Sequence, residues 1–132
     1  MIEIIDHPGE LEMRVTHATL EGLYGEALRG LAREIDAPGA GARRERRPVD
    51  IRSSGADTLL ADLLNEAVYL IDVEGFVPDG LEDARVTGGA LTGVLVGRRS
   101  ADARALVKAA TYNGLAVRRV PNGWEGRVVV DV

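Results

Sequence analysis

ADTLLADLLNEAVYLIDVEG, residues 56–75, is the stretch of sequence that decides the fold. Its apolar residues recur at the three- and four-residue spacing of an α-helix and cover well over half of the helix circumference. These residues are Leu59, Leu60, Leu63, Leu64, Val68, Leu70 and Ile71. A helix that is apolar on most sides is buried among other elements. We therefore expect it to lie at the centre of the core.

The polar residues of the same helix form one stripe, made of Asp62, Asn65, Glu66 and Tyr69. Their spacing places them side by side on the helix surface. The simplest interpretation is an edge that faces water. Asn65 and Tyr69 could instead brace a neighbouring loop.

The rest of the chain predicts a second helix and several strands. The second helix covers residues 19–36, with Thr19 as its N-cap and residues 37–42 as its stop signal. Residues 43–47 are expected to be a loop, and residues 100–105 a turn of helix or a loop. Alternating patterns, joined by turns at Pro8-Gly9, Gly88-Gly89 and Asn122-Gly123, predict strands over residues 2–6, 10–15, 48–53, 81–89, 90–99, 106–112, 115–120 and 124–132. We predict the α+β class, a single domain over residues 1–132, with a mixed or antiparallel sheet packed against two main helices.

Composition excludes several classes of function. The 132 residues include no cysteine, which excludes disulfides, thiol nucleophiles and cysteine-ligated metal sites. The net charge of -5 argues against broad phosphate binding as the main activity. No signal peptide and no apolar run of the roughly 20 residues needed to span a bilayer is visible, so we expect a cytoplasmic protein without membrane contact.

Three carboxylates stand at predicted strand ends. Asp6 precedes the first turn, Glu10 follows it and Asp131 ends the last strand. If the first and last strands are neighbours, these groups converge and suit a hard cation such as Ca²⁺, which prefers oxygen ligands. The alternative is that strand ends are polar because they reach water.

Several basic and polar residues allow two interpretations each. His7 could be oriented by Asp6 as a general base, or it could stabilise the turn. Lys108 could face water or could point to a phosphate or a carboxylate cluster. The basic run at residues 43–47 could meet RNA phosphate or an acidic partner, or could be a solvated loop.

Four stretches, taken together, resemble the archease family. They are DHPGELEMRV at the start, LLADLLNEAVYLID in the apolar helix, VKAATYNGLAV, and GWEGRVVVDV at the end, in the family's order over essentially the whole chain. The match has departures. Glu10 stands where the family has Asp, Pro8-Gly9 where it has Thr-Ala, Glu12 where it has Gly, and Asn113 where it has His.

The resemblance implies an accessory protein of an RtcB-type RNA ligase in tRNA splicing or RNA repair. Such a protein is not itself an enzyme. It promotes guanylylation and multiple turnover of the ligase and meets RNA only indirectly. The resemblance also implies a divalent cation, calcium by preference, held by Asp6, Glu10 and Asp131 at the tip of the molecule. Lys108 matches the family's motif lysine, and His7 and Asn113 fall at further motif positions.

Two other functions remain open at this point. One is a chaperone-like interaction module without metal chemistry. The other is a metal-dependent phosphoester hydrolase that uses Asp6, His7 and Glu10. We expect a monomer or a weak oligomer in either case.

Overall fold

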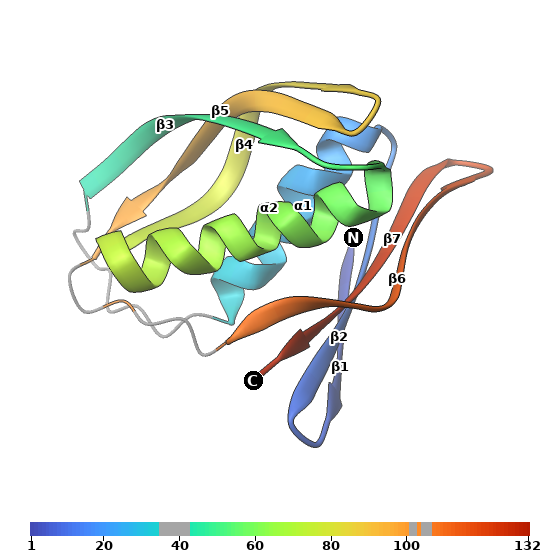
Figure 1. Cartoon of the computed structure of the whole chain (residues 1–132), viewed down its shortest axis with the longest axis horizontal. Helices are drawn as coiled ribbons and strands as arrows, with labels where there is room; N and C mark the ends of the chain where they lie inside the picture. The colour runs from blue at the N-terminus through green and yellow to red at the C-terminus, as the bar shows by residue number, and fades with distance from the viewer. Residues whose placement is uncertain (35–42, 101–102, 104–106) are drawn as a thin grey trace.

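Two antiparallel sheets enclose two helices (Figure 1). The computed structural model describes residues 1–34, 43–100, 103 and 107–132. Along the chain the elements are β1 Ile2–His7, β2 Glu10–His17, α1 Leu20–Arg33, β3 Arg43–Arg52, α2 Ala56–Tyr69, a π-helical turn Leu70–Glu74, β4 Phe76–Thr87, β5 Ala90–Arg99, β6 Ala109–Val120 and β7 Gly123–Asp131. In the described part of the chain, no helix is both long enough and apolar enough to cross a membrane.

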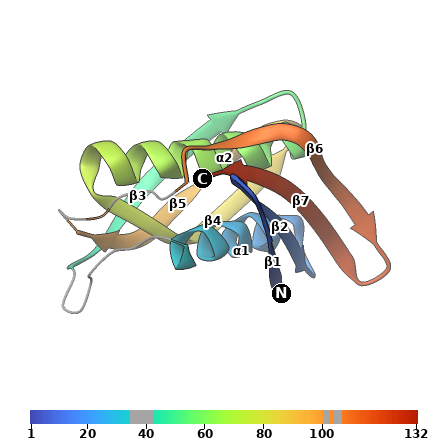
Figure 2. The same ribbon diagram turned by 90° about the horizontal axis from the view of Figure 1, so that it is seen from below.

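The strands form two separate groups. The four-stranded sheet has the order β1-β2-β7-β6, and the three-stranded sheet has the order β3-β5-β4. Each pairing is antiparallel. Both helices lie between the sheets, because α1 contacts β2 and β4 while α2 contacts β6 and β3 (Figure 2). The predicted α+β class is confirmed, and the division into two sheets is added to it.

The apolar helix is central, as predicted. Leu59, Leu60, Leu63 and Leu64 are fully buried. Leu60 of α2 and Leu23 of α1 both rest on Gly126 of β7. A Cβ atom added at Gly126 would lie only 3.3 Å from the Leu60 Cδ2 atom and 3.1 Å from the Leu23 Cδ2 atom. The missing side chain at Gly126 therefore lets both helices approach the four-stranded sheet closely.

The first helix begins where predicted. The Thr19 hydroxyl accepts a hydrogen bond from the Gly22 N–H at 3.0 Å, which satisfies one of the free donors at the helix start. Glu34 is its C-cap. The predicted continuation to residue 36 and the stop signal at residues 37–42 lie outside the described residues, as does most of the turn predicted at 100–105.

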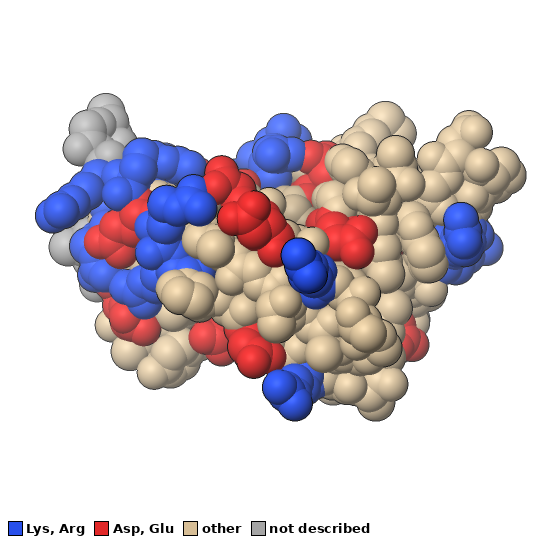
Figure 3. Space-filling model, turned by 90° about the horizontal axis from the view of Figure 1, so that it is seen from above, with Lys and Arg blue, Asp and Glu red and all other residues tan. Residues whose placement is uncertain are grey.

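The loop predicted at residues 43–47 is wrong, because these residues begin β3. They pair in register with the end of β5, and their arginines meet acids from elsewhere in the fold. Arg44 lies 2.7 Å from Asp79, Arg47 lies 2.6 Å from Glu74, and Arg46 also pairs with Glu82. Figure 3 shows this mixture of basic and acidic side chains over one end of the three-stranded sheet. Pairing with β5 makes these residues a strand, and acids of β4 and of the π-helical turn balance the charge of their arginines.

Two other predicted breaks lie inside strands. Residues 78–80 were expected to precede a strand, yet β4 begins at Phe76 and shifts its register between Pro78 and Gly80. Asn113-Gly114 was expected to separate two strands. The two are one strand, β6, with an irregularity between Thr111 and Ala116. A β-bulge absorbs residues that would otherwise end a strand. The predicted hairpins at Pro8-Gly9 and Gly88-Gly89 are confirmed. The third hairpin, predicted at Asn122-Gly123, turns one residue earlier, at residues 121–122.

Asn65 fastens α2 to β6. Its side-chain oxygen accepts from the Ala110 N–H at 2.8 Å, and its amide donates to the Ala110 carbonyl at 3.2 Å. The bracing role suggested by the sequence is confirmed, but the braced segment is a strand.

We expect Asn65→Ala to lower the free energy of unfolding by about 2 kcal/mol, because two partly buried hydrogen bonds are lost and the Ala110 backbone is left unpaired. Urea unfolding measures this. Asn113→Ala is the matched control, since that exposed side chain should change stability by less than about 0.5 kcal/mol. Equal stability of both variants would contradict a bracing role for Asn65.

Candidate functional site

One end of the four-stranded sheet brings the predicted acidic residues together. Glu10 of β2 lies directly opposite Asp131 of β7. The Asp131 carbonyl accepts from the Lys108 N–H at 2.7 Å, and the Gly9 carbonyl accepts from the Val132 N–H at 3.1 Å. These bonds fix the β1–β2 hairpin, the end of β7 and the start of β6 against each other. We call the residues Asp6, Glu10 and Asp131 the acidic tip.

The strand register divides the acidic tip between two faces of the sheet. Residues opposite each other in an antiparallel sheet share a face, and neighbours along a strand alternate. His7, Glu10 and Asp131 therefore stand in one row on the outer face. Asp6 is opposite Leu11, which is buried, so Asp6 lies on the side of the sheet that faces the helices. Of the three carboxylates, Glu10 and Asp131 are the pair that the fold places side by side.

The acidic tip is not neutralised by basic side chains. No described Lys or Arg forms an ion pair with Asp6, Glu10 or Asp131. Asp6 and Asp131 are exposed, and Glu10 is half-buried. The described residues contain no group of three His, Asp or Glu side chains close enough to hold a metal ion. The oxygen ligands suit a hard cation, and two carboxylates on one face supply part of the six to eight ligands that Ca²⁺ takes.

Lys108 and Asn113 occupy different positions relative to the acidic tip. Lys108 is exposed directly before β6, and its main chain is bonded to Asp131. Asn113 is exposed in the irregular part of β6. It lies four residues along β6 from Ala109, the residue opposite Asp131. The fold thus brings Lys108 to the tip and leaves Asn113 away from it.

A buried carboxylate on the outer face was missed by the sequence interpretation. The side chain of Glu12 is only 6% exposed and accepts from Arg127 Nη2 at 2.8 Å and from Arg14 Nε at 2.5 Å. Arg127 also donates to the Gly114 carbonyl at 2.7 Å and so holds the irregular part of β6. Alternation placed Glu12 on a wet face, and no signal in the sequence pairs it with an arginine 115 residues away.

The hydrogen bond from Arg127, followed by the one from Arg14, lowers the pKa of Glu12. A carboxyl group whose pKa is lower in the folded state stabilises the fold above its unfolded pKa of about 4.3, and this contribution is lost as the pH falls through the folded value. We expect Glu12→Gln to reduce the free energy of unfolding by about 1–3 kcal/mol at pH 7. The difference from the parent should shrink below about pH 4.3. Denaturant unfolding from pH 7 to pH 3 tests this, and a difference that does not change with pH would contradict it.

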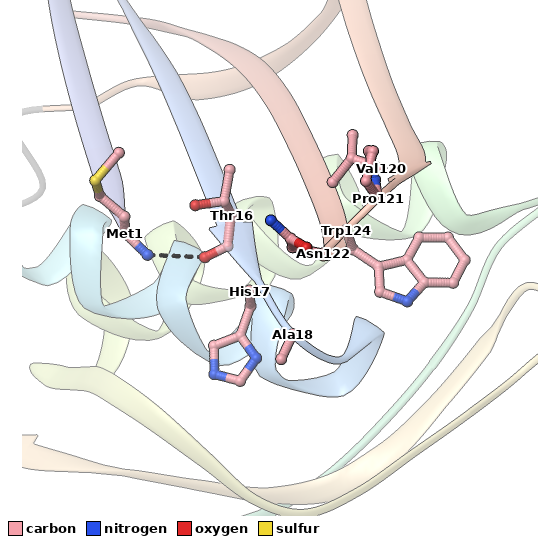
Figure 4. A pocket seen from close by; sticks show the side chains of 8 residues that line it. All are labelled: Met1, Thr16, His17, Ala18, Val120, Pro121, Asn122 and Trp124. Atoms are coloured by element: carbon pink, nitrogen blue, oxygen red, sulfur yellow. Dashed lines mark hydrogen bonds between the residues drawn. The ribbon is translucent and has the colours of Figure 1, made fainter.

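A pocket lies at the opposite end of the same sheet. It has a volume of about 570 Å³ and lies where His17 of β2 meets Trp124 of β7 (Figure 4). The lining residues are Met1, Thr16, His17, Ala18, Val120, Pro121, Asn122 and Trp124. None of the predicted site residues is among them, so the acidic tip is a surface site and not part of this cavity.

Comparisons with known proteins agree over nearly the whole chain. The model of the archease protein family (MTH1598/TM1083) matches residues 2–132. The chain is 26% identical to "Protein archease" of Methanosarcina barkeri and 27% identical to that of Methanosarcina acetivorans, over 98% of this chain and 94% of each relative. Among solved structures, Methanobacterium thermoautotrophicum protein 1598 superposes with a TM-score of 0.74 at 22% identity, covering 99% of this chain and 98% of that one. An archease from Thermotoga maritima, described as a possible chaperone, superposes with a TM-score of 0.65 at 20% identity, covering 100% of this chain and 98% of that one.

Proposed function

Because this chain belongs to the archease family, we propose that it is a non-enzymatic accessory protein of an RtcB-type RNA ligase. It would promote guanylylation of the ligase, and hence multiple turnover, in tRNA splicing or RNA repair. The observation that carries the proposal is the pairing of Glu10 with Asp131 at an exposed sheet end, without a described basic partner. A cytoplasmic location belongs to the same proposal.

The carboxylates would act through a bound cation. Glu10 and Asp131 would hold a divalent ion, calcium by preference. Asp6, which the family resemblance adds as a third ligand, lies on the opposite face and would have to reach the same ion around the end of the hairpin. When bound, the ion would supply a positive centre for phosphate or carboxylate oxygens of the ligase. The chain's own part is to keep these ligands in place, through the backbone bonds that join Asp131 to Lys108 and Val132 to Gly9. Lys108 adds a second positive charge at the same edge.

The test of the proposal is RNA ligation by an RtcB-type ligase from the same source, with RNA in large excess. With this protein present, we expect many joined RNA molecules for each ligase molecule, and without it about one. If an active ligase gives equal yields in both cases with the folded protein, the accessory role is wrong.

Calcium binding should depend on the paired carboxylates. We expect isothermal titration of the parent with Ca²⁺ to give measurable binding, and Asp131→Asn to weaken it by about ten- to a hundredfold. A lost charged contact is worth roughly 1.5–3 kcal/mol, and each 1.4 kcal/mol is a factor of ten. Asp50→Asn, on the other sheet, is the control. Unchanged affinity in Asp131→Asn would exclude Asp131 as a ligand.

A second candidate is a chaperone-like interaction module without metal chemistry. It is favoured by the division of the acidic tip between two faces, which leaves only two of its carboxylates side by side. It predicts protection of the ligase from thermal aggregation, with the same protection from Asp131→Ala. A metal-dependent hydrolase built on Asp6, His7 and Glu10 is disfavoured, because the register places Asp6 and His7 on opposite faces.

A further inference from the structure

Exposed apolar side chains gather beside α2. Five large hydrophobic residues of the described chain are exposed, and two of them are its first and last residues. The other three are Tyr69, Val73 and Tyr112, with 53%, 63% and 59% of their surfaces exposed. Large aromatic side chains exposed together on one surface are typical of protein interaction sites. We call this surface, together with Asp62 and Glu66, the tyrosine stripe.

The tyrosine stripe is built by two elements that lie side by side. Helix α2 packs along β6 in both ribbon views (Figures 1 and 2). Asp62, Glu66 and Tyr69 follow each other on one face of α2 at spacings of four and three residues. From β6, the Tyr112 hydroxyl donates to Asp62 at 2.6 Å. This bond holds the exposed ring against the helix, so less side-chain freedom is lost when a partner binds.

The negative charge of the stripe is uncompensated. No described Lys or Arg forms an ion pair with Asp62 or Glu66. Several carboxylates elsewhere are matched by arginines, as Glu45 is by Arg99 and Glu125 by Arg118. Tyrosine rings bind guanidinium and ammonium groups through their faces. The stripe therefore fits a surface that presents Arg and Lys side chains, and its charge repels nucleic-acid phosphate.

The stripe is also tied to the acidic tip. Asn65 on α2 holds Ala110, and the next residue back along β6, Ala109, lies opposite Asp131. Tyr112 is three residues further along the same strand. The stripe lies on the helix side of the four-stranded sheet, and Glu10 and Asp131 lie on its outer face. Because β6 is an edge strand, a partner seated on the stripe would reach the tip around that edge.

We infer that the tyrosine stripe docks a basic surface of the partner ligase and so holds that ligase at the edge strand β6, around which it reaches Asp131. This inference rests on the proposed function. It separates two tasks: the stripe supplies affinity, and the tip supplies the stimulation that follows binding. Because the two tasks lie on different residues, they can be removed separately.

The experiment measures binding and stimulation of the same ligase with three variants. Tyr69→Ser/Tyr112→Ser should raise the Kd at least tenfold, measured by surface plasmon resonance, and ligation should recover to the parent level at saturating concentration. Glu66→Lys should lower the association rate and its salt dependence. The control Asp50→Lys makes the same charge change on the three-stranded sheet and should bind as the parent does. Asp131→Ala should keep the parent Kd and lose stimulation at saturation. Urea unfolding confirms that each variant is folded.

The outcomes distinguish the inference from the proposed function. If the double tyrosine variant is folded and binds the ligase as tightly as the parent, the docking inference is wrong while the accessory role stands. If the parent neither binds nor stimulates, both are wrong. Sedimentation velocity tests whether a second copy of this chain, instead of the ligase, binds the stripe. If the parent self-associates and the double variant does not, the stripe joins two copies of this chain, and the ligase inference is overturned.

Discussion

Asp131→Ala is expected to reduce multiple-turnover ligation to the level of the ligase alone. Asp131 is exposed at the end of β7, and its carboxylate contacts no described basic side chain, so the fold does not depend on that side chain. Its backbone carbonyl, which anchors Lys108, is kept by alanine. The loss therefore falls on the carboxylate and on whatever cation or ligase group it contacts.

The matched control for Asp131→Ala is Glu3→Ala. Glu3 is an exposed carboxylate on the same face of the same sheet, away from the acidic tip. Both variants should unfold within about 0.5 kcal/mol of the parent, because surface substitutions rarely change stability more. Stimulation should be lost only with Asp131→Ala. Equal stimulation by both variants, each folded, would show that Asp131 has no part in the activity.

Leu60→Ala is expected to cost about 2–5 kcal/mol of unfolding free energy, the usual range for a buried leucine. Leu60 is fully buried and lies with Leu23 on Gly126 of β7, where α1, α2 and the four-stranded sheet meet. Removing its side chain leaves a cavity between three elements that cannot all move inward. For a domain of this size such a loss is a large share of the usual total of about 5–15 kcal/mol.

Leu60→Met is the control for packing, because it conserves volume and should cost less than about 1.5 kcal/mol. Guanidinium unfolding compares the three proteins. A cost below 1 kcal/mol for Leu60→Ala would mean that α2 does not hold the two layers together.

Local patterns predicted the elements that depend on near neighbours. The helical spacing of Leu59 to Ile71 marked α2, Thr19 marked the start of α1, and Pro8-Gly9 marked the first hairpin. Each of these signals is read within a few residues, so no distant partner had to be known. Pro8-Gly9 shows why: Gly9 has φ 78°, the conformation that the third position of a type II turn requires.

Features that depend on distant partners were not predictable. Residues 43–47 form a strand by pairing with β5, about 50 residues away, and Arg44 and Arg47 then meet Asp79 and Glu74. The burial of Glu12 depends on Arg127, at the other end of the chain. A single sequence shows charge and periodicity but not which strands become neighbours, and so the division into two sheets was not foreseen either.

The candidate site shows the same limit. Turn chemistry indicated that Asp6 and Glu10 flank a hairpin, strand patterning placed Asp131 at the end of the last strand, and the family resemblance made all three motif positions. The register then decided that Glu10 and Asp131 share a face and that Asp6 does not. A shift of one residue in either strand would have reversed this, because neighbouring side chains alternate between faces.

The most direct measurement is the rate at which the ligase becomes covalently guanylylated, followed with labelled GTP after one round of ligation, with and without this protein. The accessory role predicts faster guanylylation with the parent and no acceleration with Asp131→Ala. A rate that is the same with the folded parent and without it would contradict that role.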